Sequence, residues 1–185
     1  MEEQNIYAAP TATEMEAKPK AEGVMSPILA LKDQSTWRLF FLTLITLGIY
    51  MAYYQLRQSR RLNEFLPADY QVPVGLSTAT LIMAFVSVPF FFWTIFSDNA
   101  VVSSVSDWLD LAYNILTIVW AFKVRNRIHF LTEWKWGDPQ RFKWGWTLIF
   151  AGLYVNRKVN VLCRAEEERV KASLTAEEAP SSTAP

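Results

Sequence analysis

The chain has 185 residues, with 18 Lys and Arg and 18 Asp and Glu, so its formal net charge is zero. This balance hides a division, because residues 36–164 carry 13 basic and 7 acidic side chains while the two ends carry an acidic excess. Between Leu62 and Phe122 there is no Lys or Arg, and this stretch is too apolar and too long for a soluble protein of this size. Composition therefore excludes a water-soluble enzyme and predicts an all-α integral membrane protein.

Composition along the chain predicts three parts. Residues 1–35 combine Pro, Ala and Thr with scattered charges and cannot bury enough apolar surface to offset their chain entropy, so they are expected to be a disordered cytoplasmic tail. Residues 36–165 form the membrane domain, with apolar segments at about 39–56, 75–97, 106–124 and 144–156. Residues 166–185 are expected to hold the end of an amphipathic helix and a second disordered tail.

The two middle apolar segments predict a central transmembrane helical hairpin. As a helix, 75–97 would extend about 34 Å, enough to cross a hydrocarbon core of roughly 30 Å. The connection at 98–106 has no base and adjoins three aspartates, whereas both flanks of the hairpin are basic. Because basic loops stay in the cytoplasm, the connection is expected to face outwards.

The outer two segments are shorter than a usual membrane span, at about 27 Å for 39–56 and about 20 Å for 144–156. If both cross fully, five flanking bases and both tails lie outside. If both dip in and return, or lie along the interface, every base is cytoplasmic. Short length, mid-segment glycines and the charge rule favour the second, re-entrant arrangement, which requires these segments to pack against the central hairpin.

The outer segments also share a short motif, which suggests a loose internal repeat. Gly48 and Tyr50 frame the first copy, Gly152 and Tyr154 frame the second, and each copy runs into a basic stretch. Coincidence between similar compositions is the alternative.

Polar side chains within the hairpin are the first candidate site. Asp107, Asp110, Asn114 and Thr117 share one helix face by their spacing, and Thr80, Ser87 and Thr94 share a face of the other helix. A carboxylate at the bilayer centre costs about 2.5–3.5 kcal/mol, so Asp110 is expected to face protein or water near the outer interface. The faces suggest an ion relay or pore lining, or, more simply, helix-to-helix hydrogen bonds with acids at a helix N-terminus.

Basic residues beside the apolar segments are the second candidate. They predict contacts with anionic lipid headgroups, helped by tryptophans at 134, 136, 144 and 146 that form an aromatic belt. Nucleic acid is not an expected partner, because the bases alternate with interfacial aromatics instead of forming a separate face. The predicted headgroup contacts are Arg57, Arg60, Arg61, Lys123, Arg125, Arg127, Arg157 and Lys158.

The sequence offers no pattern for catalysis. The only histidine, His129, and the only cysteine, Cys163, have no neighbours at metal-ligand spacing, and no phosphate loop or nucleophile motif is present. No metal, cofactor or enzymatic activity is therefore expected.

Residues 44–63, Leu-Ile-Thr-Leu-Gly-Ile-Tyr followed by aromatic residues and an Arg-rich exit, resemble a family of small bacterial inner-membrane proteins of unknown function. Asn5 to Pro10 is also similar to a tail found on many such proteins, with Ile6 in place of the usual Pro. The resemblance implies a multi-pass protein of the bacterial inner membrane and adds no catalytic residue.

These observations favour a non-enzymatic scaffold, assembly or accessory subunit, which packs its helices against a membrane partner or a second copy of itself. The alternative is a small oligomeric channel or transporter built around Asp110 and Asn114.

Overall fold

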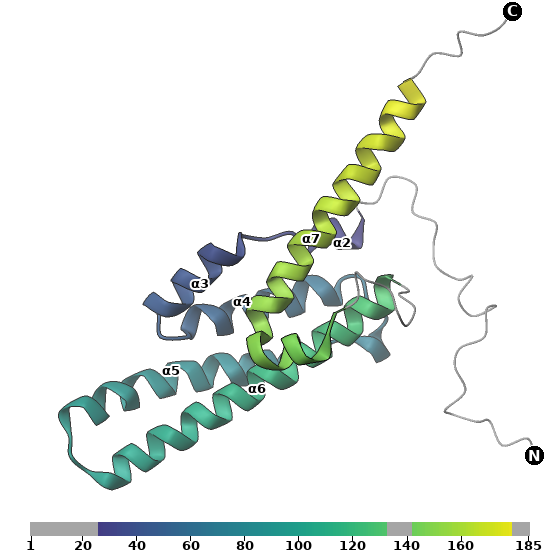
Figure 1. Ribbon diagram of the computed structural model, residues 1–185. Coiled ribbons are helices and arrows are strands. Elements are labelled where there is room, and N and C mark those ends of the chain that lie inside the picture. The colour runs from purple at the N-terminus through teal and green to yellow at the C-terminus, as the bar shows by residue number, and fades with distance from the viewer. Residues whose placement is uncertain (1–25, 133–141, 179–185) are drawn as a thin grey trace, which may run out of the picture.

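The computed structural model describes residues 26–132 and 142–178, and within these ranges the chain forms helices and no strand, which confirms the all-α class (Figure 1). In chain order the elements are α2 (Pro27–Ala30), α3 (Thr36–Ile45), α4 (Ile49–Asn63), the 3-10 turn η1 (Ala68–Tyr70), α5 (Val74–Phe96), α6 (Ala100–Thr132) and α7 (Trp144–Glu178).

Helices α5 and α6 form the central helical hairpin (Figure 1). The bounds of α5 match the prediction closely, but α6 begins at Ala100, six residues before the expected start, so the connection contains only residues 97–99. Asn99 ends this turn by accepting a hydrogen bond from the Val101 N–H at 2.9 Å. The early start places Asp107 and Asp110 inside the helix, beyond the first turn where its dipole stabilises acids.

The first outer segment is not one helix. It breaks at Leu47 and Gly48, whose φ angles of 48° and 92° are both left-handed, and α4 then returns alongside α3. The N–H of Gly48 donates to the Thr43 carbonyl at 2.8 Å, which closes the end of α3 as left-handed caps commonly do. Both ends of the 36–63 segment therefore lie on the same side of the turn.

The second outer segment breaks in the same way. Within α7 the backbone of Ala151 leaves the helical region, with φ 34° and ψ −112°, immediately before Gly152. Seven residues of α7 precede this kink. After it α7 packs into the core, and only its C-terminal end projects beyond the bundle (Figure 1).

The core lies where α4, α6 and α7 meet, around the fully buried side chains of Tyr54, Trp120 and Val155. Residues 26–35 join it, because Leu31 is buried and the segment is held by α4 and α7. This differs from the disordered tail expected over 1–35, since the segment is ordered by long-range contacts and not by its own composition. Residues 1–25 and 179–185, which make up the rest of the two expected tails, lie outside the described residues.

Candidate functional site

A buried polar junction joins α4, α5 and α6. The Trp120 Nε1–H donates to the Ser59 hydroxyl at 2.7 Å, and Ser59 shares a second 2.7 Å hydrogen bond with the Ser77 hydroxyl. One helical turn away, Gln55 Nε2 donates to the Thr117 hydroxyl at 3.2 Å. All five side chains are buried. Buried hydrogen bonds of this kind fix how helices pack, particularly where lipid surrounds them.

Sequence reasoning missed four of these five residues. Ser77 carried a usable signal, because it extends the buried small-residue face of α5 that continues through Thr80, Ala84 and Ser87. Gln55, Ser59 and Trp120 carried none, since their partners are 61 or 62 residues away in the sequence or on another helix.

The predicted polar face of α6 is divided by the structure. Thr117 is buried against α4, whereas Asp107, Asp110 and Asn114 are exposed. The Asn114 Nδ2 donates to the Asp110 backbone carbonyl at 2.8 Å, which places these two residues side by side along the helix.

The polar residues predicted on α5 make mostly local hydrogen bonds. Thr80 is buried and donates to the Leu76 carbonyl at 2.9 Å, and Thr94 donates to the Phe91 carbonyl at 2.7 Å. Ser87 is buried, and its hydroxyl has no partner among the described residues. No hydrogen bond links these residues to Asp107, Asp110 or Asn114 within the described part of the chain.

The height of the α3–α4 turn explains this division of α6. The Tyr113 hydroxyl donates to the Gly48 carbonyl at 3.0 Å, so the turn lies level with Tyr113. Below this level α4 is joined to α6 by the Gln55–Thr117 and Ser59–Trp120 hydrogen bonds, and α7 also packs against α6. Above it, towards the 97–99 connection, α4 has ended and α6 packs chiefly against α5.

The two copies of the glycine-tyrosine motif adopt related structures. Gly48 and Gly152 each follow a residue with a left-handed φ and precede a long helix. The Tyr50 hydroxyl donates to Gln34 Oε1 at 2.9 Å, and the Tyr154 hydroxyl accepts from the Lys143 N–H at 3.1 Å. In both copies the tyrosine thus contacts a residue one or two positions before the short first helix, which supports a structural repeat.

The two copies are joined at residue Gln34. Its backbone carbonyl accepts hydrogen bonds from Asn156 at 3.2 Å and from Asn160 at 3.0 Å, both on α7. Its side chain meanwhile accepts from Tyr50 on α4. The segment before α3 therefore ties α4 to α7.

Several predicted headgroup contacts are engaged within the protein. Arg57 pairs with Asp33, whose side chain is only 10% exposed, and Arg61 approaches the same carboxylate at 3.9 Å. Arg127 lies over the Tyr70 ring at 5.3 Å from its centroid. Among the remaining predicted contacts, Lys123, Arg125 and Lys158 are half-buried, whereas Arg60 and Arg157 are exposed.

Trp144 and Trp146 of the predicted aromatic belt are exposed, while Trp134 and Trp136 lie outside the described residues.

His129 and Cys163 each make a hydrogen bond that holds α7, or the residues just before it, against the rest of the protein. His129 Nε2 accepts a hydrogen bond from the Phe142 N–H at 3.2 Å. Cys163 is buried and its thiol donates to the Ile28 carbonyl at 3.0 Å; burial raises the pKa of this thiol to about 11. Across residues 26–132 and 142–178, no three His, Cys, Asp or Glu side chains group together as a metal site would require.

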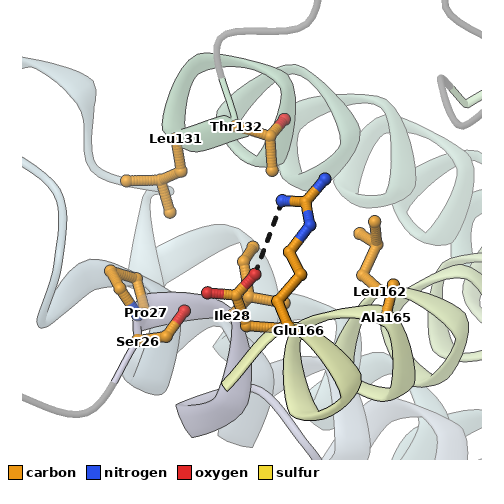
Figure 2. Close-up of a pocket in the computed structure, with 9 residues that line it drawn as sticks. Ser26, Pro27, Ile28, Leu131, Thr132, Leu162, Ala165 and Glu166 are labelled. Atoms are coloured by element: carbon orange, nitrogen blue, oxygen red, sulfur yellow. Dashed lines mark ion pairs between the residues drawn. The ribbon is translucent and has the colours of Figure 1, made fainter. Parts of the chain in front are cut away.

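A hollow of about 250 Å³ lies between α2, the end of α6 and α7 (Figure 2). Its lining includes Ile28, Leu131 and Leu162, and its two charged residues, Glu166 and Arg169, pair with each other at 3.7 Å. The charges that line the hollow therefore neutralise each other.

Together these features define an all-helical protein. Among its described residues one helical stretch, Ala68–Phe96, which contains η1 and α5, is long and apolar enough to cross a membrane, with a mean hydropathy of 2.0. The chain belongs to the family described as "Domain of unknown function (DUF4234)", which matches residues 34–130. The match begins at Gln34 and ends near the end of α6, so it includes the buried polar junction. Comparison with curated proteins and with solved structures finds no match.

Proposed function

We propose that this protein is a non-enzymatic scaffold or accessory subunit of the bacterial inner membrane, which packs its helices against another membrane protein. In this arrangement α5 and α6 cross the bilayer, and their connection faces outwards. The α3–α4 turn and the kinked start of α7 dip into the membrane from the cytoplasmic side and return.

The exposed surface of the hairpin supports placement in a membrane. Only 17% of the apolar window in Ala68–Phe96 is buried, whereas the core helix of a soluble protein would be mostly buried. Contiguous exposed apolar surface of this kind requires lipid or another protein to cover it. The large exposed side chains on α5 and α6 include Ile82, Phe85, Phe92, Trp93, Trp108 and Leu111.

The grouping of bases supports the re-entrant arrangement. Lys32 pairs with Glu167 on α7 at 2.5 Å, and its backbone carbonyl accepts from Arg61 on α4. Asn156, next to Arg157, contacts the same segment through Gln34. The bases before α3, at the end of α4 and after the kink in α7 therefore share one end of the bundle, as the charge rule requires of a single cytoplasmic side.

One observation carries the scaffold function: the outer half of α6 exposes hydrogen-bonding groups among exposed apolar side chains. Asp110 and Asn114 are exposed beside Leu111 and Ile115, which are also exposed. In contrast, Thr117 and Trp120 on the same helix are satisfied within the chain. Polar side chains in a membrane helix are stabilised by hydrogen bonds to a neighbouring helix, so the outer half of α6 is expected to contact a partner.

The same exposure favours a second candidate, an oligomeric channel in which several copies line a pore with Asp110 and Asn114. Proton or cation flux through liposomes that hold the purified protein would support it. Flux that is unchanged in the Asp110→Asn protein would remove this site from the channel hypothesis.

In-membrane cross-linking tests the scaffold function. In a Cys163→Ser background, Leu111→Cys is expected to form disulfide or maleimide cross-links to a discrete partner in native membranes, because position 111 lies on the uncovered part of α6. Ile82→Cys on α5 is the matched exposed control and is expected to react without a discrete product. A protein that cross-links at neither position and always purifies as an isolated monomer in mild detergent would refute the proposal.

The topology is tested separately by a reporter fused after Leu174. The re-entrant arrangement places this point in the cytoplasm, and a reporter active only on the outer side would overturn it.

A further inference from the structure

The partner of α6 can be characterised from the charge of the surface that it would cover. This surface, here called the outer α6 face, consists of Asp107, Asp110 and Asn114 with the exposed apolar side chains Trp108, Leu111 and Ile115. It extends outwards from about the level of Tyr113, where the α3–α4 turn contacts α6.

Helix geometry sets the depth of Asp110. Thirteen residues separate it from Lys123, the first base on the cytoplasmic side, so it lies about 20 Å along the helix from that base. In a hydrocarbon core of about 30 Å, Asp110 is then roughly 10 Å inside the outer boundary. An ionised carboxylate at this depth is stabilised by a nearby positive charge or by water.

Neither α5, the connection nor the outer part of α6 has a base that could supply this charge. From Leu62 to Phe122 the chain contains no Lys or Arg, and this range covers α5, the connection and the outer two thirds of α6. A second copy in the same orientation presents the same base-free range at the same depth, so pairing two copies through this face would bring carboxylates together without neutralising them. Neither the hairpin nor a second copy of it therefore supplies a base for Asp110, and a base on a different protein would complete the charge pair.

Ser87 provides an independent observation at the same level. Ser77 and Trp120 are both bound to Ser59, which fixes the register of the antiparallel pair. Ser87 lies ten residues after Ser77 in α5, and Asp110 lies ten residues before Trp120 in α6. Because the two helices are antiparallel, Ser87 is level with Asp110. The Ser87 hydroxyl is buried in α5 and has no partner among the described residues, so the outer half of the hairpin leaves a second polar group unsatisfied at this height.

We infer that the outer α6 face binds a transmembrane helix of a different protein, and that this helix carries a Lys or Arg about 10 Å below the outer membrane boundary to pair with Asp110. The amide of Asn114 offers a further hydrogen bond, since its Nδ2 has a second N–H beyond the one given to the Asp110 carbonyl. The inference rests on the proposed membrane scaffold and specifies the chemistry of its partner.

Synthetic transmembrane peptides test this pairing. The full-length protein is reconstituted in phosphatidylcholine vesicles with a photo-crosslinkable Leu/Ala helix that carries one Lys about seven residues from one end. Peptides with Leu or Asp at that position are the comparisons. The Lys peptide is expected to bind at least about tenfold more tightly than the Leu peptide, as desolvated charge pairs commonly achieve.

Variants connect this preference to Asp110. Asp110→Asn is expected to reduce Lys-peptide binding to the Leu-peptide level, while Asp98→Asn, in the connection, leaves it unchanged. Asp110→Lys is expected to reverse the preference and favour the Asp peptide, a gain that a misfolded protein would not show. Helical circular dichroism of each variant checks the fold.

Two results would overturn the inference. Equal binding of the Lys and Leu peptides would refute the charge pairing. Helix packing against a partner, and so the proposed function, would still stand. If no peptide binds and the protein instead self-associates in a way that depends on Asp110, the partner is a second copy of this chain and not a different protein. The cross-linking at position 111 decides the scaffold function independently of both.

Discussion

The left-handed turn at Gly48 is expected to be sensitive to a single added methyl group. Gly48 has φ 92° and ψ −18°, a conformation that disfavours any side chain, and its carbonyl accepts the Tyr113 hydroxyl. A Cβ at this position would lie 3.2 Å from that hydroxyl oxygen. In Gly48→Ala, both the backbone and the contact with α6 are therefore perturbed.

The expected loss in the free energy of unfolding is the sum of two contributions. A left-handed alanine costs about 1–2 kcal/mol relative to glycine. Displacing Tyr113 weakens one hydrogen bond, which contributes about 1 kcal/mol. Together these give a destabilisation of about 2–3 kcal/mol.

Gly75→Ala is the matched control. Gly75 lies in α5 without a positive φ, and an added Cβ would meet nothing within 4 Å. This substitution is expected to stabilise the protein by about 0.5 kcal/mol, because alanine has less freedom to lose on folding. Unfolding by SDS in mixed micelles, followed by circular dichroism, measures both. Equal changes in the two variants would refute the argument from backbone conformation.

Three further predictions concern the segments that surround this turn. Gly152→Ala would place a Cβ 2.6 Å from Met51 Sδ and is expected to destabilise by about 1–3 kcal/mol, a loss that adding Met51→Ala partly recovers in the double-mutant cycle. Asp33→Ala leaves the half-buried Arg57 guanidinium unpaired and is expected to cost about 1–3 kcal/mol in the same unfolding assay, with Asp33→Glu much milder. Because burial raises the pKa of Cys163 from 9.0 to about 11, the folded protein at pH 8 holds roughly 100-fold less thiolate than the unfolded chain, and its stability is expected to fall as pH rises through 9 to 11. Iodoacetamide labelling at pH 8 that is equally fast in folded and SDS-unfolded protein would contradict this last expectation.

Apolar length and charge predicted the central part of the fold well. The bounds of α5 follow directly from the charge-free run after Tyr70, because a helix of that composition is specified by local sequence. The start of α6 was missed because the whole of 98–106, which includes Ser103 and Ser104, was assigned to the connection. In the structure Ser103 and Ser104 donate to the Asn99 and Ala100 carbonyls and belong to the first turns of the helix.

The breaks and the candidate site were harder to predict, for a different physical reason. A glycine within an apolar run indicates flexibility, but the turn at Gly48 is selected by contact with Tyr113, which is 65 residues away. The order of residues 26–35 likewise depends on α4 and α7, through partners such as Asn160 at a separation of 126 residues. Local composition contains no information on such contacts, so the tail was expected to be disordered.

The repeat and the unpaired acids follow from one arrangement. Gly152 lies against Met51 and Trp120, so the kink of the second copy packs just after the turn of the first. With both turns at this level, the polypeptide on either side of each turn returns towards the end where Asp33, Arg57 and Arg61 pair. The outer part of the α5–α6 hairpin is consequently left without a covering helix from the described chain. The neutral total charge balances a basic membrane domain against acidic chain ends. Within the membrane domain the charges are divided again, between a basic end where Arg57 and Arg61 pair with Asp33 and an acidic outer face whose counter-charge, on the present proposal, belongs to another protein.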